Sequence, residues 1–238
     1  MSTLETTTKW SYRKKITLTG QSGAGTNYQV FLKVGESSGS TGADFHLGGH
    51  SKFPSAKNDG GDLRFTDNDG ETLLPFWVEE VSGTSPNRVA KVWVKVKDDL
   101  GSNVDIYCYY GNINASNASN GEGVFDFFDD FDGTSLDTSK WSGDTTGFSV
   151  SSGNLKGTNT TGRLQSVSSF SYTTIQEVRA KTVARATNGQ QIAGFFASTS
   201  DGLGFLTHPS PDYIKNNDTW ASLGSQIISY NVWYLFNT

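Results

Sequence analysis

The sequence consists largely of short runs in which apolar and polar residues alternate, separated by clusters of Gly, Asn and Asp. Alternation with a period of two is typical of a strand buried on one face, and such clusters are typical of turns. We therefore expect an all-β fold with almost no helix, built as two β-sandwich domains. The predicted strands lie at 13–19, 28–34, 62–66, 73–81, 90–96 and 104–110, and then at 127–131, 148–150, 154–156, 162–166, 172–184, 190–197 and 233–236.

Composition narrows the classes of function. The length of 238 residues suits two domains, and 27 Gly with only 18% charged residues suit many strands joined by polar turns. The 19 Lys and Arg against 24 Asp and Glu give a net charge of -5 without a long block of like charges, which disfavours nucleic acid as a partner. No run approaches the roughly 18 apolar residues of a membrane span, so we do not expect membrane insertion. The opening MSTLETTTKW lacks the basic and apolar segments of a signal peptide, so export cannot be read from it.

A polar segment divides the chain. The stretch NINASNASNGEG, from Asn112 to Gly123, contains small polar residues without apolar periodicity. It predicts a β-sandwich domain at 1–112, a linker at 113–123 and a second domain at 124–238. Cys108 is the single cysteine, so a disulfide within the chain cannot form, and its place on a predicted strand favours a buried apolar role.

Five motifs occur together in the first domain: YRKKIT at 12–17, GDLRF at 61–65, LPFWVE at 74–79, VWVKV at 92–96 and IYCYYGN at 106–112. In combination they resemble the domain of unknown function 2341, a β domain often found before laminin-G-like modules in bacterial and archaeal surface proteins. The resemblance covers most of residues 10–112. It implies a β domain at the cell surface but no established activity.

The segment FDDFDGTSLDTSKW at 128–141 has the form of a domain start. It resembles the opening of concanavalin A-like jelly rolls, which include family 16 glycoside hydrolases and laminin-G-like glycan binders. The resemblance implies that the second domain is such a jelly roll. The sequence ends at Thr238 directly after the apolar run 232–236, so we expect the jelly roll to be incomplete, with its closing strands missing.

The resemblance to hydrolases does not extend to catalytic residues. A family 16 hydrolase carries two glutamates and an aspartate on alternating positions of one strand, so that all three face the cleft. Glu177 is the only glutamate after Glu122, and no such triplet follows the strand-like runs 175–181 and 189–196. We therefore expect the protein not to be an enzyme, with a degenerate or unusual glycoside hydrolase as an alternative.

The acidic residues of the domain start suggest a metal. In the hydrolase relatives the middle acidic residue of this motif helps to bind a structural calcium ion, and Asp130 occupies that position here. Calcium prefers several oxygen ligands supplied by loops. Asp130 is therefore a candidate calcium ligand, with a solvated acidic turn as the alternative, and we expect no cofactor that the protein requires.

Aromatic side chains are the remaining candidates for binding, because sugars stack their C–H faces on aromatic rings. Alternation predicts that some of them face outward from strands of the first domain, and others fall where lectin-like relatives form a concave face. Packing against other parts of the protein is the alternative for both sets. The candidates are Trp77, Trp93, Tyr107 and Tyr109 in the first domain, and Phe195, His208, Tyr213 and Trp220 in the second.

These observations favour a pair of non-catalytic modules that recognise glycans or mediate adhesion. The expected partners are a polysaccharide or glycoconjugate, together with other surface-protein modules or copies of the chain. The expected location is extracellular or surface-displayed. A structural module of a virion or surface filament, without a ligand, explains the same residues and is the alternative.

Overall fold

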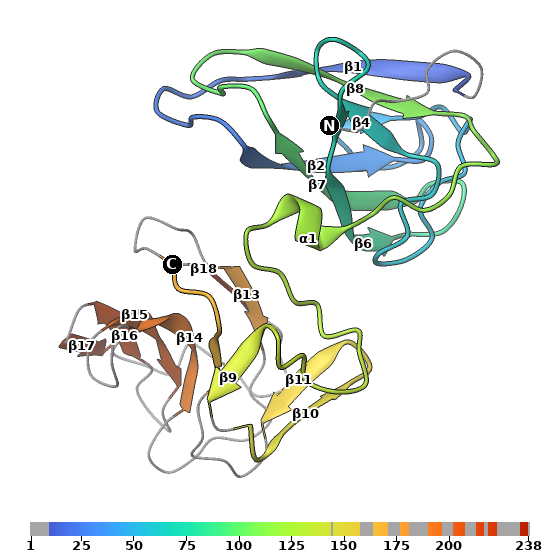
Figure 1. Ribbon diagram of the computed structural model, residues 1–238. Coiled ribbons are helices and arrows are strands. Elements are labelled where there is room, and N and C mark those ends of the chain that lie inside the picture. Colours follow the sequence, from blue (N-terminus) through green and yellow to red (C-terminus); the bar gives the residue numbers. More distant parts are fainter. Residues whose placement is uncertain are drawn as a thin grey trace. The chain divides into compact units, whose positions relative to one another are not determined.

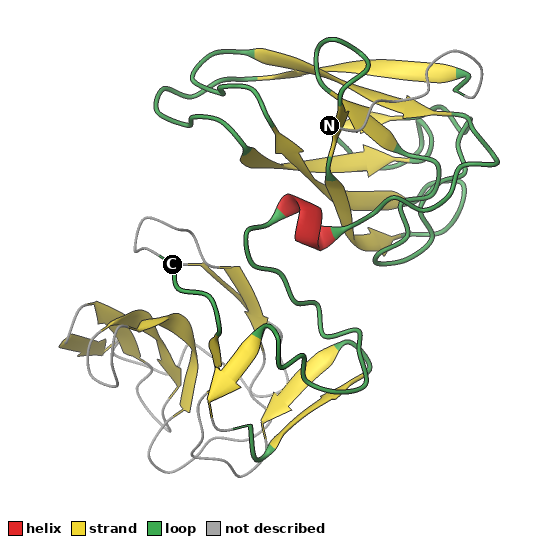
Figure 2. Cartoon of the chain, in the orientation of Figure 1, coloured by secondary structure: helices red, strands yellow, loops and turns green. Residues whose placement is uncertain are grey.

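The computed structural model describes residues 10–143, 145–157, 164–170, 177–180, 190–196, 202–207, 213–216, 219–222 and 234–237. In these residues the protein is all-β, with one short helix, as the alternation predicts (Figures 1 and 2). The chain divides into two compact units, Met1–Asp130 and Phe131–Thr238. No helix among the described residues is long and apolar enough to cross a membrane.

Two four-stranded sheets form the first unit. One has the order β1-β8-β4-β5 and consists of β1 (Tyr12–Leu18), β8 (Val104–Tyr110), β4 (Arg64–Thr66) and β5 (Leu73–Leu74). The other has the order β3-β2-β7-β6 and consists of β3 (Phe45–His46), β2 (Tyr28–Gly35), β7 (Val89–Val96) and β6 (Phe76–Ser82). All neighbouring strands are antiparallel except β2 and β3. Strands β1, β2, β7 and β8 agree with the predicted runs to within one residue.

The core of the first unit lies between the two sheets. In β7, Val92, Val94 and Val96 are fully buried, whereas the residues between them are half-buried on the outer face. In β8, Ile106 and Cys108 point inward and are also fully buried, which confirms the apolar role expected for the cysteine. Burial of such side chains stabilises the folded unit by about 25 cal/mol per Å² of apolar surface removed from water, and it is the main stabilising force of the unit.

A proline and a glycine determine where strands β4, β5 and β6 end or begin. The run at 73–81 divides into β5 and β6 at Pro75, which has no N–H, but its carbonyl accepts a hydrogen bond from the Lys95 N–H at 3.0 Å. The Asp67–Gly70 segment makes the turn between β4 and β5, with Gly70 at φ 74°. Here a positive φ favours glycine.

Residues 113–123, expected to form a linker, lie against the first unit. Asn117 Oδ1 accepts the Gly60 N–H at 2.8 Å, and Ser119 Oγ accepts the Val78 N–H at 2.9 Å. Helix α1 (Gly121–Val124) follows, with the Asn120 side chain accepting from the Glu122 N–H as its N-cap. Asn-capped helix starts satisfy an otherwise unpaired N–H.

The strand expected at 127–131 is not formed. Phe131 has a φ of 55°, which is incompatible with an extended strand. Phe128 and the preceding Phe125 instead turn their rings onto Trp77 of β6. Tertiary packing of these aromatic side chains overrides the local alternation.

The described part of the second unit contains antiparallel strands only. Two-stranded pairs join β9 to β12, β10 to β11 and β13 to β18, and a four-stranded sheet has the order β14-β15-β16-β17. The bounds are β9 (Trp141–Gly143), β10 (Phe148–Ser151), β11 (Asn154–Gly157), β12 (Leu164–Ser166), β13 (Glu177–Ala180), β14 (Gln190–Phe196), β15 (Gly202–Thr207), β16 (Tyr213–Asn216), β17 (Thr219–Ser222) and β18 (Tyr234–Asn237). The sequence patterns did not predict β9, β15, β16 or β17.

Candidate functional site

Trp77 and Trp93 lie on the outer face of the β3-β2-β7-β6 sheet, opposite each other on β6 and β7. The segment after α1 covers much of this face, because the Phe128 ring lies 4.7 Å from Trp77 and the Phe125 ring lies 5.6 Å from Trp93, centroid to centroid. The indole N–H of Trp93 donates to Glu79 Oε2 at 2.8 Å. Trp77 likewise donates to Asn58 Oδ1. Trp77 is therefore part of a packed aromatic cluster, and the Phe31 side of Trp93 faces the groove described next.

A groove of about 890 Å³ lies on the open side of the sandwich, between the edge strand β1 and strand β2. Its apolar floor includes Ile16 and Leu32. At its rim are Tyr28 and Phe31, which are 43% and 37% exposed, and Phe31 lies 5.0 Å from the Trp93 ring. Polar side chains also line it, including Lys15, Thr17, Thr19, Gln21, Gln29 and Asp44.

The backbone of β2 adds polar groups to this groove. Lys33 directs its N–H to Asp44 Oδ2 at 2.7 Å and its carbonyl to the Asp44 N–H at 2.8 Å, both on the side away from β7. Because backbone groups alternate along a strand, Phe31 and Gln29 direct their N–H and C=O groups to that same side. No strand among the described residues pairs with β2 there. The groove therefore offers both donors and acceptors beside aromatic rings.

Tyr107 and Tyr109 lie on the outer face of the β1-β8-β4-β5 sheet, as predicted. Tyr109 is only 7% exposed and donates its hydroxyl hydrogen to the Gly70 carbonyl at 2.9 Å. Tyr107 is half-buried, and the Arg13 guanidinium lies over its ring at 4.8 Å. Tyr109 is therefore packed against the turn at 67–70, whereas Tyr107 lies on a part of the surface that also carries cations.

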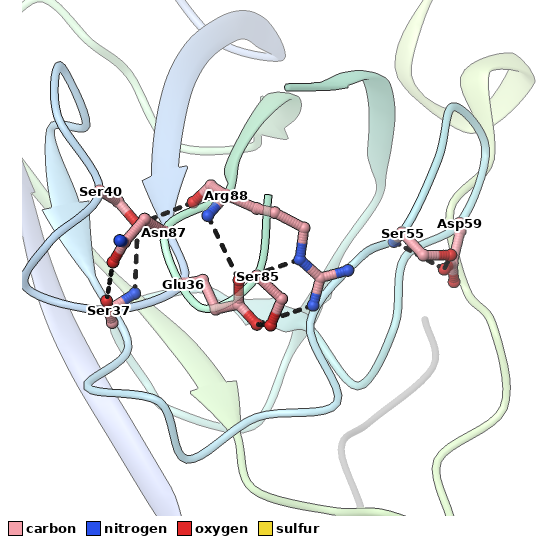
Figure 3. Close-up of polar contacts among 8 residues, drawn as sticks. All are labelled: Glu36, Ser37, Ser40, Ser55, Asp59, Ser85, Asn87 and Arg88. Atoms are coloured by element: carbon pink, nitrogen blue, oxygen red, sulfur yellow. Dashed lines mark hydrogen bonds and ion pairs between the residues drawn. The ribbon is translucent and has the colours of Figure 1, made fainter. Parts of the chain in front are cut away.

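A partly buried ion pair anchors the long loop after β2 (Figure 3). Glu36 Oε1 lies 2.7 Å from Arg88 Nη2 and Glu36 Oε2 lies 2.9 Å from Arg88 Nε, the bidentate geometry that gives the strongest carboxylate pairs. Ser85 Oγ donates to Glu36 Oε1 at 2.9 Å. The hydrogen bonds from Arg88 lower the pKa of Glu36 to about 2. These contacts join the loop to the β6–β7 turn and have the character of a structural tether.

Asp130 makes contacts with residues of the first unit. Its Oδ2 lies 3.3 Å from Lys57 Nζ and accepts a hydrogen bond from Asn58 Nδ2 at 2.6 Å. A calcium ion at this carboxylate would have to displace the lysine ammonium, because two cations repel each other at such distances. No cluster of three or more acidic, His or Cys side chains suited to a metal occurs in the described residues. Calcium at Asp130 stays a prediction.

Three of the second-unit candidates lie in one four-stranded sheet. Phe195 belongs to β14, Tyr213 to β16 and Trp220 to β17, with Trp220 paired with Lys215 across the two strands. His208 lies outside the described residues.

Sequence reasoning missed Tyr28, Phe31 and Asp44 as groove residues. Tyr28 and Phe31 stand at the start of a correctly predicted strand, but alternation does not reveal that this part of β2 pairs with a described strand on one side only. The sequence did carry a signal for the other wall of the groove, β1. Three consecutive charged residues, Arg13, Lys14 and Lys15, lie on this strand, and charged side chains are typical of edge strands.

The comparisons with known proteins support only the first resemblance. The family model described as a domain of unknown function (DUF2341) matches residues 59–144. No curated protein and no solved structure matches the chain. The similarity of the N-terminal region to this family therefore extends from the end of the long loop to β9.

Proposed function

We propose that the chain is a pair of non-catalytic modules that bind glycans or mediate adhesion outside the cell, and that the groove between β1 and β2 is a glycan site. The groove itself is the observation that carries the proposal. Its volume of about 890 Å³ suits a short oligosaccharide, since ligand pockets usually measure about 300–1,000 Å³.

The chemistry of the groove suits a sugar. Tyr28 and Phe31 offer exposed rings on which a pyranose can stack its C–H face. The backbone groups of Gln29 and Phe31 can pair with sugar hydroxyls around that ring. Ring stacking and peripheral hydrogen bonds together give orientation as well as affinity.

The same groove favours binding without turnover. Glycoside hydrolysis commonly needs two carboxyl groups that flank the scissile bond. Among the described residues that line the groove, Asp44 alone carries a carboxylate. We propose that the second unit is a concanavalin A-like jelly roll without the catalytic glutamate pair. Its candidate glycan-binding residues are Phe195, Tyr213, Trp220 and His208.

A glycan array probed with the full chain tests this function, followed by titration of the best ligand. Tyr28→Ala and Phe31→Ala should each weaken binding about threefold to tenfold, because each removes one stacking ring. Tyr12→Ala is the matched control, since Tyr12 is equally exposed at 42% but stacks on His50 outside the groove. Binding to no glycan, or an equal loss with Tyr12→Ala, would sink the proposal.

A structural module of a filament or virion is the second candidate. The specific observation that favours it is the side of β2 at residues 28–32, beside the edge strand β1, with which no strand of the described residues pairs, because unpaired edges accept a strand from another chain. Sedimentation velocity over a range of protein concentrations separates the two. Concentration-dependent assembly that Phe31→Ala abolishes would favour the structural module over glycan binding.

A further inference from the structure

The outer face of the β1-β8-β4-β5 sheet carries cations in an otherwise acidic chain. In one row across three strands, Tyr109 of β8 stands between Arg13 of β1 and Arg64 of β4. In the next row Lys15 of β1 stands beside Tyr107 of β8. We call this surface the cationic face and define it by Trp10, Arg13, Lys15, Arg64 and Tyr107.

The cations of this face differ in how far they are neutralised. Lys15 forms a 2.7 Å ion pair with Asp105, which also accepts a hydrogen bond from Thr17 Oγ1 at 2.7 Å. Arg13 has no carboxylate partner among the described residues. Within the described part of the chain its guanidinium makes one hydrogen bond, a long contact of 3.4 Å from Nη1 to the Tyr109 hydroxyl. A guanidinium has five N–H donors, so most of those of Arg13 are available.

Two backbone carbonyls and the Trp10 ring hold the Arg64 guanidinium in place. Arg64 donates to the carbonyls of Leu63 at 2.7 Å and Ser116 at 2.8 Å, and its guanidinium lies 5.3 Å from the centre of the Trp10 ring. The nearby Asp62 is fully buried and its Oδ2 accepts the backbone N–H groups of Gly111 and Asn112. Burial lowers the pKa of Arg64, and the Asp62 charge partly opposes this. Arg64 therefore adds a fixed positive charge about 10 Å from Arg13, two strand spacings away.

Guanidinium groups beside aromatic rings suit a planar anion attached to a sugar. Arg13 is held over Tyr107, so the edge of its guanidinium can bind a carboxylate with two parallel hydrogen bonds. The ring of Tyr107 is half-buried and its free part can contact the pyranose that bears the carboxylate. We propose that the cationic face binds an acidic polysaccharide of the polyuronate class through Arg13, Arg64 and Tyr107.

Charge complementarity selects this class of ligand over nucleic acid. Only two cations, Arg13 and Arg64, carry the proposed binding, and at about 10 Å apart they suit a polymer with one carboxylate per sugar better than a dense polyphosphate. Arg13, Arg64 and Tyr107 do not line the groove between β1 and β2, whereas Lys15 belongs to both surfaces. Binding at the cationic face extends the proposed glycan binding and does not depend on the groove.

The test is affinity electrophoresis and titration of the full chain with polygalacturonate, using neutral dextran, dextran sulfate and single-stranded DNA in parallel. Arg13→Gln should weaken polygalacturonate binding about tenfold, the loss expected for one charge-assisted hydrogen bond pair. Lys15→Gln should change it less than about twofold, because Asp105 already neutralises Lys15. Binding should fall as salt shortens the Debye length from about 10 Å at 0.1 M to about 3 Å at 1 M.

A gain of affinity separates recognition from a structural role. Asp105→Asn keeps the acceptor for Thr17 but frees Lys15, and should strengthen polygalacturonate binding about threefold. Phe31→Ala should leave it unchanged, whereas it should weaken any neutral glycan bound in the groove. Protection of the Cys108 thiol from labelling verifies that each variant is folded, because that thiol is fully buried.

Several results would overturn the inference. Equal binding of polygalacturonate by the native chain and Arg13→Gln would exclude the cationic face as the site. Equal affinity for DNA or dextran sulfate at matched charge would replace recognition of uronates with general attraction to polyanions. Loss of binding with Phe31→Ala alone would assign the polyuronate to the groove.

Discussion

The Glu36–Arg88 pair allows a quantitative prediction about stability. Glu36→Gln keeps the shape of the side chain but removes its negative charge. The Glu36 carboxylate accepts hydrogen bonds from Arg88 Nε and Nη2. The Glu36 carboxylate has a pKa of about 2 in the folded chain against 4.5 for the unperturbed group, a difference of about 2.5. At about 1.36 kcal/mol for each pKa unit, the ionised form stabilises the fold by about 3 kcal/mol at neutral pH.

The sign of the pH dependence follows from the lowered pKa. The stabilisation is fully present above the unfolded pKa of 4.5 and is lost as the pH falls through about 2, since protonation then removes the charge. The difference between the native chain and Glu36→Gln should therefore be about 3 kcal/mol at pH 7 and less than about 1 kcal/mol at pH 2.

Cys108 provides the assay, because it is the single cysteine and lies in the core of the first unit. Its exposure during denaturation, followed with a disulfide reagent that reacts at acid pH, reports the unfolding of that unit alone. Glu80→Gln is the matched control, since the Glu80–Lys91 pair is 38% exposed on both sides and should be worth less than about 1 kcal/mol. A loss of stability in Glu36→Gln that is the same at pH 7 and pH 2 would refute the electrostatic account.

Three further predictions concern the loop, the covering segment and the metal. Gly61→Ala should destabilise the first unit by at least about 2 kcal/mol in thermal unfolding, because Gly61 has a φ of 55° and an added Cβ would lie 2.0 Å from the Lys52 carbonyl oxygen; unchanged stability would contradict the geometry. Phe128→Ala should increase acrylamide quenching of tryptophan fluorescence and cost about 1–2 kcal/mol, since it uncovers Trp77; unchanged quenching would show that the segment does not cover the indole. Lys57→Met should tighten calcium binding in calorimetric titration, because it removes the ammonium 3.3 Å from the Asp130 carboxylate; no calcium heat in either protein would exclude a calcium site at Asp130.

Much of the fold of the first unit was predictable because burial alternates with the strand period. Val92, Val94 and Val96 point inward and Trp93 points outward, and a period of two in the sequence is sufficient to predict both. Short strands such as β3 were not predictable, since two paired residues carry no period. The failure at 127–131 has a different cause, because Phe128 packs on Trp77, which lies far away in the sequence.

The candidate sites were predictable only in part. Sequence alternation correctly placed Trp93 and Tyr107 on outer faces, but it could not show that Phe128 covers Trp77 or that Gly70 accepts the Tyr109 hydroxyl. The groove and the cationic face both depend on which strands are neighbours. Strand order is a long-range property that local propensity does not encode.

The most direct test of glycan binding is a nuclear magnetic resonance titration of the isotope-labelled chain with the best ligand from the array. The groove predicts chemical-shift changes at the backbone amides of Gln29 and Phe31, which point into it, and at the indole N–H of Trp93, which lies beside Phe31. Shifts confined to residues away from the groove, or no shifts at saturating glycan, would contradict the account.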